Sequence, residues 1–171
     1  MPNRLIAFLG NPGQDYRRTR HNAGAAVFDA GCERRGWSPS TRFTGLLVVG
    51  GGCLFFRPLT FMNKSGDPVS RALAFYKLPP ASLVVVHDDT ELPFGKVQYR
   101  SGGGLAGHNG LRSIKDRIGT PEFHRIRIGI GRPAHGTLQS HVLGRFSPDE
   151  AAQLGSVVDT VLALVDDLCT E

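Results

Sequence analysis

Cysteine and long apolar runs are scarce in this chain. The three cysteines among 171 residues, Cys32, Cys53 and Cys169, are odd in number, widely spaced and set in apolar surroundings. This pattern favours buried free thiols in a reducing compartment over a disulfide or a metal site. No apolar run approaches the roughly 20 residues that a membrane span requires. The first residues pass at once into a strand-like run, so we expect no signal peptide and a cytoplasmic location.

Basic residues are absent from the last 25 positions. Residues 147–171 carry six acidic side chains and no Lys or Arg, so this segment has a charge of −6. Because the whole chain has a net charge of +5, residues 1–146 carry +11. Sixteen of the twenty basic residues are arginine, the side chain that grips phosphates in a bidentate way. The imbalance favours a polyanionic partner such as nucleic acid, although ordinary basic enzymes also carry such an excess.

The length fits one domain, residues 1–171, which buries enough surface to fold without disulfides or a structural metal ion. Apolar runs and turn residues predict the first part of the fold. The expected elements are a buried strand at Arg4–Gly10, a helix at His21–Arg35 closed by Gly36, a hairpin of Leu46–Val49 with Cys53–Phe56, and a central strand at Leu83–Val86.

The second half of the chain continues the alternation of strands and helices. We expect an edge strand at Lys96–Arg100, a helix from about His108 to Ile118, and a strand at Arg125–Ile130 with Arg outward and Ile inward. Residues 131–146 are expected to be irregular, and 147–169 to form an acidic amphipathic helix with a capping box at its start. The predicted fold is α/β, a single domain with a mixed, mainly parallel central sheet wrapped by helices.

Polar clusters follow several of the expected strands, where α/β proteins place their sites. They contain His21, Asn63, Asp88 and Asn109. A carboxylate such as Asp88 bonded to one ring nitrogen of His21 would fix the tautomer and make the imidazole a better base. The two asparagines can donate amide hydrogens to a carbonyl or an oxyanion. Because no G-x-S-x-G nucleophile motif is present, the set suits hydrolysis by a His-activated water.

Two competing patterns point to bound groups. Gly102, Gly104 and Gly107 satisfy G-x-G-x-x-G with Glu122 about 20 residues on, as in dinucleotide-binding proteins. The strand before them is polar, however, so we expect no cofactor. His87, Asp88 and Asp89 could ligate a metal, but the sequence has no H-x-x-x-H motif or Cys pair to complete the site. We therefore expect a structural role for His87.

Six stretches in register resemble the bacterial-type peptidyl-tRNA hydrolase family. They run along nearly the whole chain: Leu9–Gly13 with Tyr16, Thr19–Gly24, Arg57–Gly66, Val85–Asp89 with Leu92–Pro93 and Gly95–Lys96, Gly102–Gly104 with Gly107–Leu111, and Arg125–Pro133 with Val142–Phe146. Each stretch is a weak signal alone, but the six together are specific.

The resemblance implies an activity and a set of roles. The family cleaves the ester between a peptide and the 3′ end of tRNA, and so recycles tRNA from stalled translation. By position, His21 would activate water, Asp88 would keep it basic, and Asn11 would select blocked aminoacyl-tRNA. The substrate and the tRNA end would be lined by Tyr16, Phe61, Asn63 and Asn109. Position 61 is usually tyrosine in the family, so a hydroxyl contact is lost here.

The resemblance also implies partners and a rival function. The expected partner is peptidyl-tRNA, which the protein would contact at the acceptor stem and the 3′ end. The protein is expected to act as a monomer, with no metal, cofactor, membrane or protein partner. Some organellar relatives keep the fold but act as RNA-splicing partners without hydrolysis. Such a binding module should have lost some of the residues at positions 11, 21, 63 and 88, and this chain retains them all.

Overall fold

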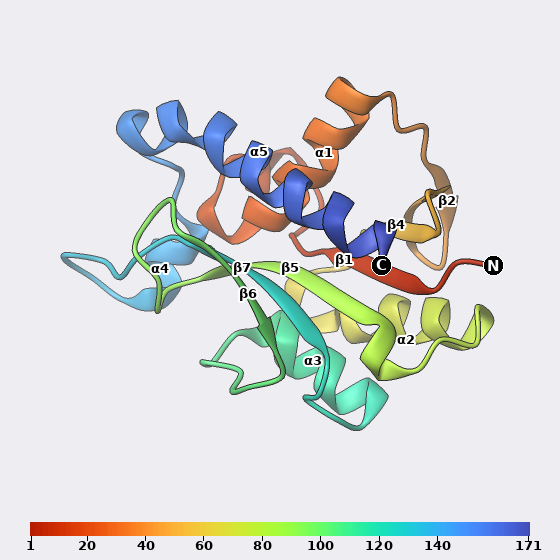
Figure 1. Ribbon diagram of the computed structural model, residues 1–171. Coiled ribbons are helices and arrows are strands. Elements are labelled where there is room, and N and C mark those ends of the chain that lie inside the picture. The colour runs from red at the N-terminus through yellow and green to blue at the C-terminus, as the bar shows by residue number, and fades with distance from the viewer.

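A seven-stranded mixed sheet runs through the middle of the protein in the order β2-β3-β4-β1-β5-β7-β6 (Figure 1). The computed structural model describes residues 1–171. The strands are β1 (Arg4–Phe8), β2 (Ser40–Arg42), β3 (Gly45–Gly50), β4 (Cys53–Pro58), β5 (Leu83–Asp89), β6 (Val97–Ser101) and β7 (His124–Gly129).

The four central strands β4, β1, β5 and β7 are parallel, and antiparallel strands flank them on both sides. On one side β3 pairs with β4 around a turn at Gly51 and Gly52, and β2 extends this hairpin. On the other side β6 pairs with β7. The prediction of a mixed, mainly parallel centre is therefore confirmed. Strand β2 was not predicted, because all three of its residues are exposed and carry no apolar pattern.

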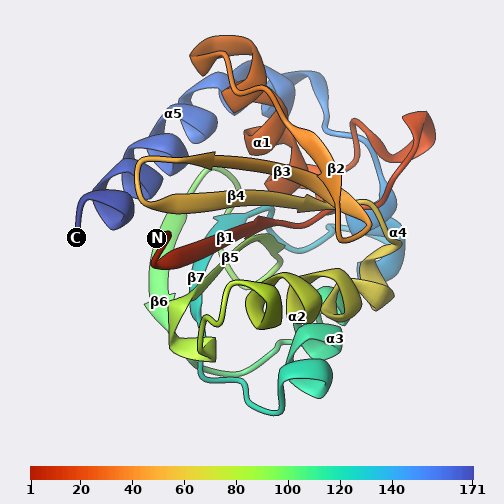
Figure 2. The same cartoon turned by 90° about the vertical axis from the view of Figure 1, so that its right-hand side faces the viewer.

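Helices cover both faces of the sheet. Helices α1 (Ala23–Arg35) and α5 (Pro148–Thr170) lie on one face, and α2 (Gly66–Phe75) and α3 (Asn109–Ile118) lie on the other (Figures 1 and 2). The short helix α4 (Leu138–Leu143) lies on the side of the molecule opposite the two chain termini. The expectation that residues 131–146 are wholly irregular is thus wrong for α4, a single helix of six residues that is too short for a periodic signal.

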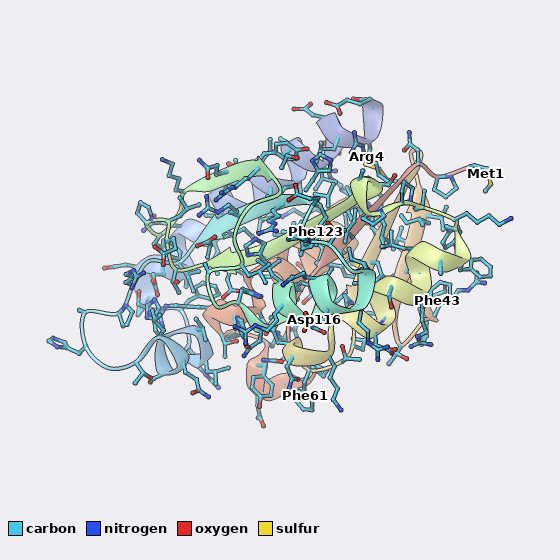
Figure 3. The ribbon with its side chains drawn as sticks, turned by 90° about the horizontal axis from the view of Figure 1, so that it is seen from below. Met1, Arg4, Phe43, Phe61, Asp116 and Phe123 are labelled. Carbon is cyan, nitrogen blue, oxygen red and sulfur yellow. A yellow bond between two sulfur atoms is a disulfide. The ribbon has the colours of Figure 1, made fainter.

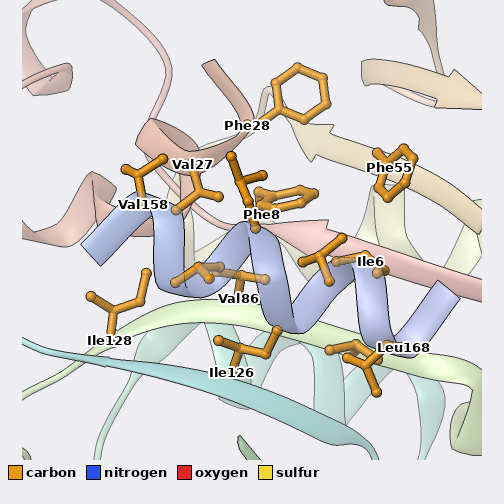
Figure 4. Packing of buried hydrophobic residues seen from close by; sticks show 14 of the residues in the cluster. Ile6, Phe8, Val27, Phe28, Phe55, Val86, Ile126, Ile128, Val158 and Leu168 are labelled. Carbon is orange, nitrogen blue, oxygen red and sulfur yellow. The ribbon is translucent and has the colours of Figure 1, made fainter. Parts of the chain in front are cut away.

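The core has two layers because the central strands are buried on both faces. Ile6, Phe8, Val86 and Ile126 pack beneath α1 and α5 (Figure 4), whereas alternate residues such as Val85 pack beneath α2 and α3. A strand covered on both sides needs apolar residues at successive positions, which explains the continuous β-branched run of β5.

The long helix α5 begins as predicted. Ser147 accepts a hydrogen bond from the backbone N–H of Glu150, whose carboxylate accepts one from the backbone N–H of Ser147. This reciprocal capping box satisfies two donors at the helix start. The buried stripe begins only at Val157, since Ala151 is exposed. The first turns of α5 therefore extend beyond the core.

The prediction that Arg125 points outward is wrong. Arg125 is buried rather than outward, because its guanidinium donates to the carbonyl oxygens of Gly103, Gly104 and Pro121 and lies over the ring of Phe123. These four partners supply the polar and aromatic contacts that a buried cation needs.

The prediction of free thiols is wrong for two of the three cysteines. Cys53 and Cys169 form a disulfide, and only Cys32 is a free thiol. The two bonded residues are 116 positions apart. They meet because the end of α5 packs beside the start of β4, a proximity that spacing along the sequence does not reveal.

Candidate active site

The loops that follow β1, β4 and β5 meet the start of α3 around one cavity of about 1060 Å³. Since β1 and β5 are parallel neighbours, their carboxyl ends bring segments distant in sequence to the same edge of the sheet. The cavity is lined by all seven site residues predicted from the sequence: Asn11, Tyr16, His21, Phe61, Asn63, Asp88 and Asn109. The predicted constellation is therefore a spatial one.

His21 and Asp88 form the buried centre of this site. His21 lies in a single 3₁₀ turn, η2 (Arg20–Asn22), directly before α1, and Asp88 lies near the end of β5. The Nδ1–H of His21 donates to Oδ2 of Asp88 at 2.8 Å. With its proton held on Nδ1, the ring carries a free lone pair on Nε2. This is the tautomer that a general base requires.

Burial and charge act in opposite directions on this pair. Burial alone would lower the pKa of His21, but the charge of Asp88 and its hydrogen bond outweigh burial and raise that pKa above its ordinary value of 6.5. Burial likewise opposes ionisation of Asp88, yet the two imidazoles beside it, His21 and His108, hold its pKa well below the ordinary range. Asp88 is therefore a carboxylate at neutral pH.

Asn11 is fixed at both its backbone and its side chain. Its backbone N–H donates to Oδ1 of Asn22 at 2.9 Å, and its carbonyl oxygen accepts from Nδ2 of Asn22 at 2.8 Å. Its own Oδ1 accepts the backbone N–H of Met62 at 2.7 Å. The Nδ2 group of Asn11 is thereby left as the free end of the amide, in the wall of the cavity.

Aromatic and amide side chains form the outer part of the cavity wall. Tyr16 and Phe61 make an edge-to-face pair with ring centroids 6.1 Å apart. Phe61 projects outward from the molecule, and its residue is 54% exposed (Figure 3). Asn63 and Asn109 are exposed at the cavity as well, so their amides are accessible to a ligand. Exposed aromatic rings of this kind offer stacking surfaces for bases.

The glycine pattern does not have the structure of a dinucleotide site. It follows β6, an antiparallel edge strand, instead of a buried parallel strand. The carbonyl groups of Gly103 and Gly104 are bound by Arg125, whereas a phosphate would need backbone N–H groups directed at it. The loop therefore serves to bury an arginine.

A metal ion also fits the site poorly. His21, Asp88 and His108 place three potential ligand atoms within 4.8 Å of one another. However, Nδ1 of His108 accepts the backbone N–H groups of Gly110 and Leu111, so the ring proton lies on Nε2. A protonated nitrogen cannot ligate a metal. The donor set fits two imidazoles bonded to one carboxylate.

Part of the arginine charge is paired within the protein. Four arginines pair with acidic residues of α5 or the terminus next to it: Arg4–Glu171, Arg20–Glu150, Arg34–Asp159 and Arg35–Asp166. These pairs account for part of the charge asymmetry without any external anion. Lys64 and Arg100 line the cavity and make no ion pair, so they remain available to an anionic ligand.

Three supporting residues were missed in the sequence. Asn22 fixes the backbone of Asn11, and His108 donates to Asp88. Arg20 bonds both Glu150 and the carbonyl oxygen of His141, which ties the turn carrying His21 to α4 and α5. All three lie in the stretches that resemble the hydrolase family, but their partners are distant in sequence and cannot be read from it.

Comparison with known proteins identifies the family to which this chain is similar. Residues 5–171 match the family model described as peptidyl-tRNA hydrolase. The chain is 44% identical to the peptidyl-tRNA hydrolase of Geotalea daltonii, over 100% of this chain and 92% of that protein. It is 45% identical to that of Geobacter sulfurreducens, over 99% and 91%.

A solved structure is similar as well. The crystal structure of peptidyl-tRNA hydrolase from Acinetobacter baumannii matches with a TM-score of 0.89 and 35% identity, over 98% of this chain and 88% of that one. The shared fold and the near full-length sequence matches agree with each other. The chain belongs to the peptidyl-tRNA hydrolase family.

Proposed function

We propose that this protein hydrolyses the ester bond between a peptide and the 3′ end of tRNA. The observation that carries this proposal is the buried His21–Asp88 pair, whose Nδ1–H···Oδ2 bond leaves Nε2 of the imidazole free beside the cavity. A base of this kind activates water without a covalent intermediate. Membership of the peptidyl-tRNA hydrolase family supplies the substrate class.

The reaction follows from the position of the base. Nε2 of His21 takes a proton from a water molecule, and the resulting hydroxide attacks the ester carbonyl carbon. The tetrahedral intermediate collapses with cleavage of the bond to the ribose oxygen, which receives the proton back from the imidazolium. The products are a peptide carboxylic acid, which loses its proton to solvent, and tRNA with a free terminal hydroxyl. Asp88 stabilises the imidazolium and fixes its orientation throughout.

Asn11 supports selection of the blocked substrate. Because its Oδ1 is held by Met62, its Nδ2 presents hydrogen-bond donors to the cavity. A donor there favours the amide carbonyl of a peptidyl group over the ammonium of an unblocked aminoacyl group, which has no acceptor to offer. We assign this selection to Asn11 on the fixed orientation of its amide.

The remaining lining residues divide between the reacting carbonyl and the tRNA end. Asn63 and Asn109 can donate to the oxyanion or to the terminal ribose, while Tyr16 and Phe61 offer faces on which the terminal bases can stack. Stacking at Phe61 requires no hydroxyl, so the exchange of the family's usual tyrosine preserves it.

Two basic side chains in the cavity wall support binding of the tRNA phosphates. The cations of Lys64 and Arg100 would meet phosphates of the acceptor end. No helix of the structure is both long enough and apolar enough to cross a membrane. Peptidyl-tRNA is made during translation, which supports a cytoplasmic location for the enzyme.

The test is release of N-acetylated amino acid from N-acetyl-aminoacyl-tRNA, beside unblocked aminoacyl-tRNA and a His21→Ala variant. We expect rapid cleavage of the blocked substrate alone, lost in the variant while the fold and tRNA binding persist. Tight tRNA binding by the parent without cleavage would instead support the splicing-partner function. Turnover by His21→Ala comparable to the parent would remove His21 as the base.

A further inference from the structure

His108 makes hydrogen bonds in two directions at the entrance to α3. It is the N-cap residue of that helix, and its Nδ1 accepts the backbone N–H groups of Gly110 at 3.1 Å and Leu111 at 3.2 Å. Its Nε2 lies 2.9 Å from Oδ1 of Asp88. One ring therefore connects the start of a helix to the buried carboxylate of the active site.

The helix start determines which nitrogen of His108 carries the proton. Because Nδ1 accepts two backbone N–H groups, the proton is on Nε2, and Nε2–H donates to Asp88. Asp88 consequently has a donor on each oxygen, His108 on Oδ1 and His21 on Oδ2. A carboxylate held at both oxygens cannot rotate away from His21, whereas one held at a single oxygen can.

We propose that His108 is a positioning residue that uses the N-terminus of α3 to hold Asp88 in line with Nδ1 of His21. The chain of contacts runs from α3 through His108 and Asp88 to the base. This inference rests on the proposed function, because positioning matters only if His21 is the base. His108 itself touches no reacting atom in this scheme.

The charged and titratable groups around His108 define the expected effect on pH dependence. The rings of His21 and His87 lie 5.0 and 5.1 Å from its ring, centroid to centroid, and Asp88 is its only carboxylate partner. Asp89, the next acidic residue on β5, is paired with Arg127. Removing the donor on Oδ1 leaves more of the charge of Asp88 directed at His21, which favours the imidazolium. The acid limb of kcat/KM should then move to higher pH.

Two substitutions separate the two bonds of His108. His108→Asn keeps a side-chain acceptor at the helix start but is too short to donate to Asp88. His108→Gln can place an N–H near the position of Nε2 but has no acceptor at the position of Nδ1. The first variant removes the positioning bond and the second removes the cap. Their thermal unfolding, kcat, and kcat/KM against pH are measured beside the parent enzyme.

We expect His108→Asn to lose mainly activity and His108→Gln to lose mainly stability. His108→Asn should keep the parent Tm within about 1 °C, lose roughly tenfold in kcat, as is typical when an orienting partner is removed, and shift its acid limb upward by roughly half a pH unit. His108→Gln should lower Tm by roughly 2 to 4 °C, as expected for a lost helix cap, and lose less kcat than His108→Asn, because its N–H still reaches Asp88. The proposal would be overturned if His108→Asn had the same kcat and pH profile as the parent. It would also be overturned if, in both variants, the fall in kcat were proportional to the fall in Tm.

A direct readout separates this inference from the proposed function. The imidazole titration of His21, followed by NMR in the parent and in His108→Asn, requires no turnover. An upward shift in the variant supports the positioning bond even if the parent proves inactive on peptidyl-tRNA, a result that would refute only the proposed function. An unchanged titration of His21 would overturn the role of His108 whether or not the parent cleaves the substrate.

Discussion

Reduction of the Cys53–Cys169 disulfide should destabilise the protein by loosening the end of α5. Cys53 is fully buried at the start of β4, and Cys169 lies in the last turn of α5. Between the disulfide and the first turns of α5, Val165 and Leu168 belong to the apolar stripe that covers one face of the sheet. The disulfide therefore ties one end of this cover to the sheet.

The magnitude follows from the length of chain that the disulfide closes. A separation of 116 residues corresponds to about 4.9 kcal/mol in the chain-entropy model, which is an upper value because residual structure in the unfolded chain reduces it. Measured contributions centre on about 2 to 4 kcal/mol. For a chain of this size, such a loss corresponds to a fall in Tm of roughly 5 to 15 °C.

The assay is thermal unfolding with and without a thiol reductant, with two matched variants. Cys169→Ser removes the disulfide at its less buried end, so it should show the reduced Tm under both conditions. Cys32→Ser removes the free thiol and should respond to reductant as the parent does. A Tm that is the same in reductant and in its absence, or three titratable thiols in the denatured unreduced protein, would refute the reasoning.

Three further outcomes test the site. Because Asp88 raises the pKa of His21, and the imidazole is a base only when neutral, kcat/KM should rise with pH through a limb above 6.5; a limb below that value would contradict the raised pKa. Asp88→Asn removes the charge that raises this pKa, so the limb should move to lower pH and kcat should fall, though less than in His21→Ala; an unchanged pH profile would remove Asp88 from the mechanism. Lys64→Ala should raise KM and flatten its salt dependence while kcat stays within about twofold, and a fall in kcat alone would argue against a phosphate contact.

Local patterns in the sequence were sufficient for most of the fold. The β-branched run of β5 predicted a strand covered on both faces, and all its residues are buried. The Ser147–Glu150 pattern predicted the start of α5 because both hydrogen bonds of a capping box lie within four residues. Gly36 closes α1 in the left-handed conformation, as its position after the last helical residue indicated. Each of these features depends on neighbours along the chain.

The wrong predictions concern features that depend on distant segments. Arg125 alternates with isoleucines as an outward residue would, but the glycine-rich loop folds over it and supplies carbonyl oxygens. Cys53 and Cys169 have no spacing signal, since they meet only after α5 has packed on the sheet. In both cases the partner is contributed by the tertiary fold, which overrides the local pattern.

The active site lies between these two cases. The residues to which we assign the chemistry were predicted from the sequence together with the resemblance, and all seven line the cavity. The bonds that fix their geometry could not be predicted, because each joins segments more than ten positions apart: Asn22 to Asn11, His108 to Asp88, and Arg20 to Glu150.

These supporting bonds also explain how a site built from strand ends and the turns that follow them can be rigid. The turn that carries His21 is held through Arg20 to the first turn of α5, and Asp88 is held through His108 to the first turn of α3. Each side chain of the His21–Asp88 pair is thus connected to the start of a helix, and the two helices lie on opposite faces of the sheet. Catalytic geometry must be maintained to within about half an ångström, which long helices packed on a common sheet can ensure and free loops cannot. It follows that substitutions at the supporting residues should act on kcat through orientation, whereas substitutions at the exposed rim should act on KM.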